Sequence, residues 1–283
     1  MSDTLGISIM AWNRPYYLAQ CLDSLKANDL TNCDVHLWQD GAVCHITGKR
    51  LTYDGLIDQS VATFERAGLP NATVHSQERN IGCAAQRATL MPWMAERYRW
   101  FFCIDDDVVL SPHCVTLVRR ALAQFEDDPR MASISPGMGL KCPPEHWRNY
   151  LDALTYPEKH VWADAYWRDK WAQMWPWYMQ YYDIIKDHPY RHFSEYRNDV
   201  EAWARKLHVS SEVSSDTAVA RAAKLAGMRR WRFVVNRATS IGDYGLNCRP
   251  DVIDLIADVL HQPIYVTDEE LAIERFRIVE TAT

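Results

Sequence analysis

Three consecutive aspartates, Asp105, Asp106 and Asp107, end the apolar run that begins at Trp100. A continuous apolar run bounded by polar residues is typical of a buried strand in a parallel sheet. The aspartates then lie at the carboxyl edge of the sheet, where open α/β sheets bind ligands. In an extended chain Asp105 and Asp107 point to one side and Asp106 points to the other. This Asp-x-Asp pair predicts a site for Mn²⁺ or Mg²⁺ carrying substrate phosphates, because hard cations prefer carboxylate oxygens.

Taken alone, the three aspartates also fit a solvated acidic turn before a helix, with Ser111 as its N-cap. Other parts of the chain must decide between these interpretations. Net charge is −6, which argues against a nucleic-acid surface. A nucleic-acid acceptor nevertheless stays open, because four arginines are expected near the site: Arg229, Arg230, Arg232 and Arg237.

The composition, with 48% hydrophobic and 24% charged residues in 283, is that of a soluble globular protein. No apolar run follows the first four residues, so we expect neither a signal peptide nor a membrane span, and a cytoplasmic protein. Eight cysteines are scattered singly without a Cys-x-x-Cys pair, which fits reduced thiols better than a disulfide framework.

Strands and helices are expected to alternate over the first half of the chain. Strands are predicted at residues 7–11, 35–38, 73–75, 131–135 and in the run that leads into the aspartates. Helices are predicted from Pro15, which suits the first helical position, and at residues 56–67, 83–98 and 112–125. This alternation predicts an α/β fold with a mostly parallel sheet flanked by helices.

Residues 141–210 differ in composition, because they contain seven of the twelve tryptophans. Four aromatic residues there recur at helical spacing: Trp167, Trp171, Trp175 and Tyr178. This stripe fits either the core of an inserted unit or an aromatic platform for a sugar or lipid acceptor. His188 and His192 have the i, i+4 spacing of a metal pair, but no third ligand candidate stands beside them.

Helical periodicity returns at residues 213–226, with Asp216 near the start and Gly227 as the expected C-cap. A strand at residues 232–235 and a loop from Asn236 to Gly242 follow. The chain is expected to close with an acidic helical tail after one more helix, whose apolar face carries Val252, Leu255, Ile256 and Val259. By itself, Asp216 fits the N-cap of its helix.

In their order and spacing, these motifs resemble glycosyltransferases of the GT-A fold, chiefly the large family 2 and more weakly the N-acetylglucosaminyltransferase I type. The matching segments are Ile9 to Pro15, Gln39-Asp40-Gly41, Arg79-Asn80-Ile81-Gly82 with Arg87, Asp105-Asp106-Asp107, Ser215-Asp216 and Asn236 to Gly242. The resemblance covers residues 5–140 well and residues 210–250 loosely. It implies a single GT-A (Rossmann-like) domain, with a nucleotide-sugar-binding half at 1–140. Residues 141–210 then form an aromatic-rich helical insert on the acceptor side, and residues 211–283 hold the catalytic-base helix and C-terminal helices.

The resemblance also implies roles for individual residues. Those expected to bind the donor are Ala11, Trp12, Arg14, Asp40, Asn80, Gly82, Arg87, Asp105 and Asp106. Of these, Asp40 is expected to accept from a ring N–H of the base, since an ionised carboxylate is a pure acceptor. Asp107 is expected to bind the metal directly, and Asp105 to contact the ribose, the metal or a metal-bound water. Asp216 matches the base that removes the proton of the acceptor hydroxyl.

The implied activity is metal-dependent, inverting transfer of a hexosyl or N-acetylhexosaminyl group from a nucleotide diphosphate sugar, with a UDP-sugar expected. The acceptor would be a saccharide or another hydroxyl-bearing molecule. Two departures leave questions open. Ser215 precedes Asp216 where the family often has an acid, so Glu212 is a rival base. Asp105 stands where the N-acetylglucosaminyltransferase I type has Glu, which leaves the donor sugar undetermined.

Two other functions fit parts of the pattern. A sugar-nucleotide nucleotidyltransferase also uses an α/β sheet and paired acids, but Trp12 to Pro15 lack the glycines of a phosphate loop. A non-catalytic carbohydrate-binding protein would use the aromatic segment and leave Asp107 and Asp216 without a role.

Overall fold

The computed structural model describes residues 4–137, 144–156, 162–190, 192–243 and 260–279. Its strands are β1 (Leu5–Ala11), β2 (Cys33–Gln39), β3 (Thr73–Ser76), β4 (Trp100–Asp105), β5 (Val108–Leu110), β6 (Met131–Ser135), β7 (Ala153–Thr155), β8 (Ala163–Trp167), β9 (Arg229–Phe233), β10 (Ala238–Ser240) and β11 (Arg277–Ile278). Its helices are α1 (Pro15–Lys26), α2 (Asp54–Arg66), α3 (Gly82–Arg97), α4 (Cys114–Gln124), α5 (Arg168–Ile185), α6 (Phe193–Lys206) and α7 (Ser215–Leu225), with 3₁₀ turns η1 (Pro144–Tyr150) and η2 (Asp268–Ala272).

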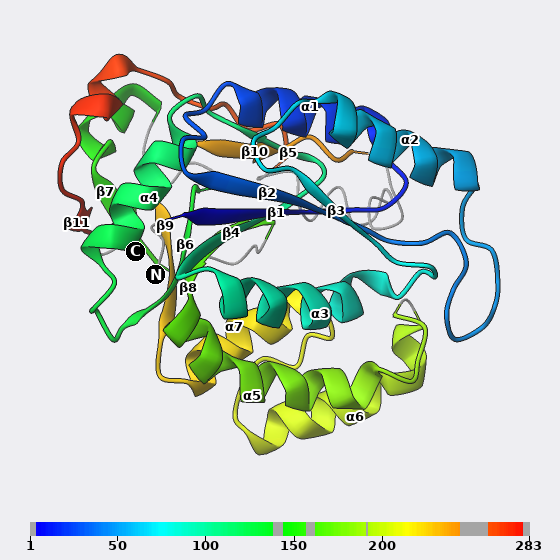
Figure 1. The fold of residues 1–283 in the computed structure, drawn as a ribbon. Coiled ribbons are helices and arrows are strands. Elements are labelled where there is room, and N and C mark those ends of the chain that lie inside the picture. The colour runs from blue at the N-terminus through cyan, green and yellow to red at the C-terminus, as the bar shows by residue number, and fades with distance from the viewer. Residues whose placement is uncertain (1–3, 138–143, 157–161, 191, 244–259, 280–283) are drawn as a thin grey trace.

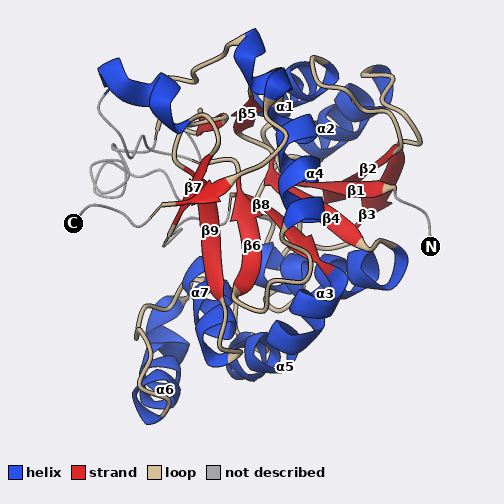
Figure 2. Cartoon of the chain, turned by 90° about the vertical axis from the view of Figure 1, so that its left-hand side faces the viewer, coloured by secondary structure: helices blue, strands red, loops and turns tan. Residues whose placement is uncertain are grey.

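Nine strands form one sheet in the order β11-β7-β9-β6-β8-β4-β1-β2-β3 (Figure 2). β1 pairs parallel with both β2 and β4, and β6 pairs parallel with β9. β8 runs antiparallel between β4 and β6, and β7 runs antiparallel to β9. The expected α/β fold with a mostly parallel sheet flanked by helices is therefore confirmed.

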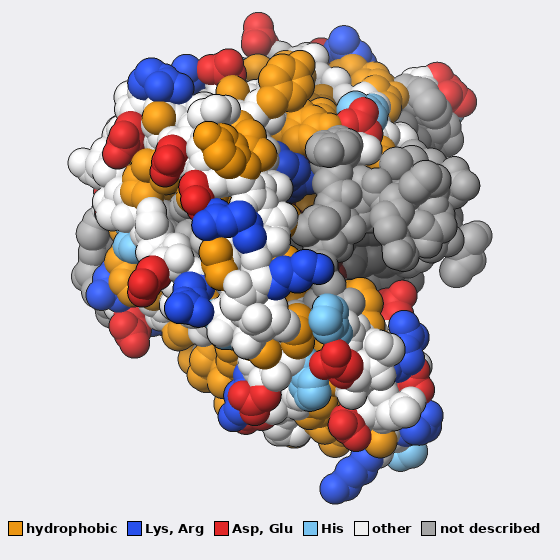
Figure 3. Space-filling view, turned by 90° about the vertical axis from the view of Figure 1, so that its right-hand side faces the viewer, with side chains coloured by type: hydrophobic (Ala, Val, Ile, Leu, Met, Phe, Trp, Pro, Cys, Tyr) orange, Lys and Arg blue, Asp and Glu red, His pale blue; other side chains and the backbone are white. Residues whose placement is uncertain are grey.

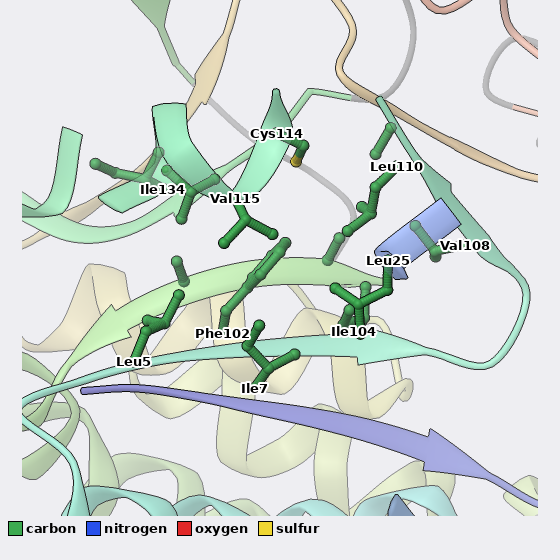
Figure 4. Close-up of a cluster of buried hydrophobic side chains, with 14 of the residues drawn as sticks. Leu5, Ile7, Leu25, Phe102, Ile104, Val108, Leu110, Cys114, Val115 and Ile134 are labelled. Carbon is green, nitrogen blue, oxygen red and sulfur yellow. The ribbon is translucent and has the colours of Figure 1, made fainter. Parts of the chain in front are cut away.

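Helices cover both faces of the sheet (Figure 1). On one face, α1, α2 and α4 pack over a core that includes Ile7, Leu25 and Phe102 (Figure 4). On the other face, α3, α5, α6 and α7 enclose a second core, in which Met94 packs with Tyr178. Pro15 opens α1 at the first helical position, where its missing N–H costs nothing. The buried positions of α1 repeat at helical spacing, as expected: Leu18, Cys21, Leu22 and Leu25.

The carboxyl ends of the parallel strands meet at one edge of the sheet. In register, Met10 of β1 lies beside Asp105 of β4, and Ala11 lies beside Gln39 of β2. The backbone continues this alignment beyond the strands, since the Asp40 N–H donates to the Ala11 carbonyl and the Asp106 N–H to that of Met10. The motifs that follow these strands are therefore brought together by the sheet.

Two expectations about local structure are wrong at this edge. Asp106 and Asp107 are not extended; β4 ends at Asp105, and a turn leads into β5. The loop expected from Asn236 to Gly242 contains the short strand β10, which pairs antiparallel with β5 in a separate two-stranded sheet. Pairing between segments so far apart in the chain leaves no local signal in the sequence.

The aromatic segment contributes to the sheet as well as to helices. Its two strands are β7 and β8, and its stripe continues in α5 as expected. Trp167 ends β8 and is fully buried, as are Trp171 and Tyr178 of α5, while Trp175 and Trp177 are half-buried. The fully buried members belong to the core, because side chains without exposed surface cannot offer a binding platform.

The remaining expectations concern helix ends, the tail and the cysteines. Gly227 ends α7 with a positive φ of 75°, as predicted for a C-cap. His113 and not Ser111 holds the N-cap position of α4. The tail contains the 3₁₀ turn η2 and β11 instead of the expected helix, and the predicted face of Val252, Leu255, Ile256 and Val259 lies outside the described residues. All six described cysteines are free thiols. No described helix has the length and apolarity needed to span a bilayer.

Candidate active site

Asp40 is buried directly after β2, facing the turn before α3. Its Oδ1 accepts the backbone N–H groups of Gly41 and Ile81, each at 2.9 Å. Its Oδ2 accepts the Gly82 N–H at 3.0 Å and Asn80 Nδ2 at 2.8 Å. Burial raises the pKa of Asp40, and hydrogen bonds from its neighbours oppose that rise. Asp40, which follows β2, thus caps the amino end of α3. It replaces a local cap, because Ile81 at the N-cap position has no side-chain oxygen.

The capping role bears on the predicted contact to a nucleobase. A ring N–H would have to share an Asp40 oxygen with donors that the protein already supplies. The base-binding role of Asp40 therefore stays a prediction. Beside it, Trp12 Nε1 donates to the Gly41 carbonyl at 2.8 Å, so the indole is fixed at the end of β1, where Ala11 is buried.

Gly82 opens α3 with a φ of 78°, in the left-handed region that favours glycine. A Cβ there would lie 3.0 Å from Cβ of Tyr190, a residue of the segment between α5 and α6. The Tyr190 hydroxyl donates to Ser215 Oγ and accepts the Ser215 N–H, both at 3.1 Å. Tyr190 therefore connects the start of α3 to the start of α7. Sequence reasoning missed it, because a single tyrosine in an aromatic-rich segment carries no distinguishing signal.

Arg87 of α3 pairs with Asp216 of α7, with Nη1 at 3.1 Å from Oδ1 and 3.2 Å from Ser215 Oγ. The Arg87 side chain is 6% exposed and that of Asp216 is 31% exposed, so solvent reaches only the carboxylate. Trp162 Nε1 donates to the other Asp216 oxygen at 3.2 Å. Burial lowers the pKa of Arg87, but Asp216, Tyr178 and Asp105 together raise it, and the pKa lies well above the ordinary value. Arg87 therefore remains a cation that holds the Asp216 carboxylate in place.

The alternative role for Asp216, a simple helix N-cap, is wrong. Ser214 is the N-cap of α7, and its Oγ accepts the Thr217 N–H at 3.2 Å. Glu212, the rival base, is exposed and accepts from Thr217 Oγ1 at 2.7 Å. The Asp216 carboxylate instead faces Arg87 and Trp162.

Arg14 bridges two of the three aspartates. Its Nη2 hydrogen-bonds Asp106 Oδ1, and its Nη1 lies 2.7 Å from Asp107 Oδ2. Burial raises the pKa of Asp106 to about 6, with Arg14 lowering it and Asp107 raising it. For Arg14 itself, burial lowers the pKa, but both aspartates raise it well above the ordinary value. The guanidinium therefore stays charged and partly neutralises this acidic turn.

Asp105 is half-buried at the end of β4. Within the described part of the chain, its carboxylate has no hydrogen bond or ion pair. Burial raises its pKa well above the ordinary value; Asp107, Asp216 and Asp106 act in the same direction, and Arg87 opposes them. Asp105 thus shares one electrostatic environment with both the acidic turn and the Arg87–Asp216 pair.

The loop after β10 lies against Asp107. The Ile241 N–H donates to the Asp107 carbonyl at 2.9 Å, and a Cβ at Gly242 would lie 2.0 Å from Asp107 Oδ2. The next residue, Asp243, accepts from the Tyr17 hydroxyl, which ties the loop to α1. Only glycine fits at position 242 while Asp107 keeps its place.

We expect Gly242→Ala to lower the free energy of unfolding by about 1–3 kcal/mol, the usual cost of overpacking. Chemical denaturation would measure it. The matched background is Asp107→Ala, which removes the oxygen that the new methyl group meets. In that background the cost of Gly242→Ala should largely disappear, since the two changes act on one contact. Equal costs in both backgrounds would contradict the contact.

Two of the acidic residues at this edge have the chemistry of divalent-cation ligands. Asp105 supplies a half-buried carboxylate without a described partner, and Asp107 supplies a second carboxylate beside it in the chain. No group of three or more His, Cys, Asp or Glu side chains that could hold a metal occurs among the described residues, and His188 and His192 each pair with Glu195. Two carboxylates fit Mg²⁺ or Mn²⁺ that takes its other ligands from substrate phosphates and water.

The sequence matches no family model and no curated protein. Among solved structures, the mannosyltransferase PcManGT from Pyrobaculum calidifontis, in complex with GDP-Man and Mn²⁺, aligns at a TM-score of 0.44 and 13% identity, over 79% of this chain and 74% of that chain. TarS 1-349 of S. aureus aligns at a TM-score of 0.43 and 14% identity, over 90% of this chain and 64% of that chain. A further S. aureus TarS structure aligns at a TM-score of 0.33 and 19% identity, over 47% of this chain and 21% of that chain. This chain thus spans about a fifth of that TarS chain.

Proposed function

We propose that the protein is a metal-dependent, inverting glycosyltransferase that moves a sugar from a nucleotide diphosphate sugar to an acceptor hydroxyl. The observation that carries the proposal is the meeting of the acidic turn after β4 with the Arg87–Asp216 pair. The Asp105 N–H donates to the Trp162 carbonyl at 2.8 Å, and Trp162 Nε1 donates to Asp216 at 3.2 Å, although Asp216 comes from the second half of the chain. Such a site offers what sugar transfer needs, namely anchoring for a diphosphate and a carboxylate reachable by an alcohol.

The donor would lie along the carboxyl edge of the sheet. Ala11 and Trp12 would line the base, and Asn80 and Gly82 the ribose and phosphates. Asp107, with Asp105, would hold Mn²⁺ or Mg²⁺, and Asp106 would stay with Arg14. When bound, the cation would neutralise charge on the departing nucleotide diphosphate. A UDP-sugar is the proposed donor.

Asp216 is the proposed base. Its carboxylate is 31% exposed, so an acceptor hydroxyl can reach it, while Arg87 and Trp162 fix its direction. Asp216 would remove the proton of the acceptor hydroxyl as that oxygen attacks from the side opposite the leaving group. A single displacement of this kind inverts the configuration at the sugar carbon. Glu212 remains the rival, but its oxygen is engaged with the side chain of Thr217 on the protein surface.

The proposed acceptor is a saccharide or another hydroxyl-bearing molecule. On the face shown in Figure 3, acidic and basic side chains are interspersed instead of forming one basic stripe. That distribution favours an uncharged acceptor over a nucleic acid. Of the four tryptophans in β8 and α5, only the half-buried Trp175 and Trp177 have surface to offer to such an acceptor.

Calorimetric titration with UDP tests the proposal. We expect UDP to bind at least about tenfold more tightly with Mn²⁺ than with EDTA, since each 1.4 kcal/mol is a factor of ten. Asp107→Ala should remove this difference. The matched control is Asp183→Ala at an exposed position of α5, where, among the described residues, the aspartate pairs only with Lys186, in a surface ion pair at 3.0 Å. Equal UDP affinity in Mn²⁺ and EDTA would reject metal dependence, and absence of UDP and GDP binding would reject the nucleotide-sugar donor.

A further inference from the structure

The guanidinium of Arg14 lies beside Asp107, the proposed metal ligand. Arg14 Nη1 lies 2.7 Å from Asp107 Oδ2, while Nη2 bonds Asp106 Oδ1. The forked guanidinium thus connects two carboxylates that adjoin in the chain, a geometry for which arginine is better suited than lysine. Arg14 precedes Pro15 at the N-cap position of α1, and its Cζ lies 5.5 Å from the centroid of the Tyr17 ring.

Arg14 and a divalent cation compete for this oxygen. A bound Mg²⁺ lies about 2.1 Å from its carboxylate ligand, and a guanidinium nitrogen at hydrogen-bond distance from the same oxygen would be held close to the ion. Two cations at such separation repel strongly in a partly buried site. Direct metal binding at Asp107 Oδ2 is therefore disfavoured as long as the Arg14 nitrogen stays on that oxygen.

The Arg14 nitrogen that leaves Asp107 needs another anion, while Nη2 can keep its bond to Asp106. The Arg14 side chain is 22% exposed, so a ligand at the site can reach part of it. A nucleotide diphosphate supplies oxygens that a guanidinium binds in a two-pronged arrangement. In that exchange the metal binds Asp107, and Arg14 Nη1 binds an oxygen of the diphosphate. Without the diphosphate, the metal would have to displace Arg14 without offering it a new partner.

We propose that Arg14 is an exchangeable counter-cation, which makes divalent-metal binding depend on the presence of a nucleoside diphosphate. The inference rests on the proposed function, because it concerns the same metal and donor. It adds a role that the donor-binding prediction for Arg14 did not contain. Because coupling between two ligands is reciprocal, the metal and the diphosphate must each raise the affinity for the other.

Mn²⁺ titrations with and without UDP test this role, read out as free Mn²⁺ by electron paramagnetic resonance. Arg14→Gln keeps a polar side chain and removes the charge. In the absence of nucleotide, we expect it to bind Mn²⁺ at least about tenfold more tightly than the parent, the equivalent of 1.4 kcal/mol. The factor by which UDP raises Mn²⁺ affinity should fall correspondingly, because the competition that UDP relieves is gone.

Two further variants complete the design. Arg14→Lys keeps the charge but loses the fork, so its Mn²⁺ affinity without nucleotide should lie between those of parent and Arg14→Gln; it also serves if the glutamine variant does not fold. Arg50→Gln is the matched control, since Arg50 is exposed and, within the described ranges, pairs only with Asp54 in a surface ion pair at 2.6 Å.

Two outcomes separate the inference from the proposed function. If the parent binds Mn²⁺ with UDP, but the Arg14 variants bind Mn²⁺ alone no more tightly than the parent, the exchange is wrong and the proposed function stands. If the parent binds no Mn²⁺ even with UDP, the proposed metal site fails and the exchange fails with it.

Discussion

Replacing Asp216 with asparagine is expected to slow sugar transfer by about 10²–10⁴-fold, the usual contribution of a general base. An alcohol is a weak nucleophile until its proton is removed, and asparagine cannot accept that proton. Donor and metal should still bind, because Asp216 belongs to α7 and Asp107 to the turn after β4. Rates of transfer with saturating donor, measured per folded molecule, would test this expectation.

The same variant should also be less stable. One Asp216 oxygen accepts from Arg87 and the other from Trp162, and the amide group of asparagine can accept at only one of these positions. We expect a loss of about 1–3 kcal/mol, the cost of leaving one such partner unsatisfied. Trp162→Phe removes the indole donor to Asp216 and keeps the carboxylate. It therefore tests how much the positioning of Asp216 contributes when its ability to accept a proton is retained.

Glu212→Gln is the matched control for the base assignment. Transfer by Asp216→Asn within a few fold of the parent would place the base elsewhere, and a large loss in Glu212→Gln would then identify the rival. A fall in stability with an unchanged rate per folded molecule would mean that Asp216 only supports α7 and Arg87.

Replacing Asp164 with alanine should lower the free energy of unfolding by about 3–5 kcal/mol, the usual result of breaking a buried ion pair. Asp164 of β8 pairs with Arg230 of β9, and their side chains are 0% and 2% exposed. Ser133 of the intervening strand β6 donates to Asp164 Oδ1 at 3.4 Å, and the Tyr166 hydroxyl donates to Oδ2 at 3.2 Å. Alanine would leave the Arg230 charge buried without its partner.

Urea denaturation followed by tryptophan fluorescence would measure this loss. Asp183→Ala, which breaks the exposed pair with Lys186, should cost less than about 1 kcal/mol. A second comparison replaces both buried partners with apolar residues, as in Asp164→Leu with Arg230→Met, and should recover much of the loss. A small cost for Asp164→Ala alone would show that water reaches Arg230.

Much of the fold could be predicted because its signals are local. Pro15 marks the start of α1, apolar runs mark the inner strands, and the repeat of Leu18, Leu22 and Leu25 marks a buried helical face. Each of these patterns depends on neighbours within a few residues. The order of the motifs along the chain was then enough to predict which strand ends share one edge.

The contacts of the site could not be predicted in the same way. Arg14 and Asp106 are separated by 92 positions, and Arg87 and Asp216 by 129. Nothing in the sequence near Asp40 indicates that it caps α3, since a carboxylate after a strand fits ligand binding equally well. The aromatic residues of β8 and α5 gave one continuous helical signal, so the strand that ends at Trp167 was hidden by the helix after it.

The position of β8 determines when the sheet can form as the chain is synthesised. β6 pairs only with β8 and β9, both of which follow it in the sequence, and β4 has its second neighbour in β8. A fragment that stops before residue 153 would therefore carry β6 without a partner and β4 with one open edge. Open strand edges recruit other chains and cause aggregation. During synthesis these strand edges stay open until β8 leaves the ribosome. For the same reason, the first half of the chain is expected to aggregate when it is expressed on its own.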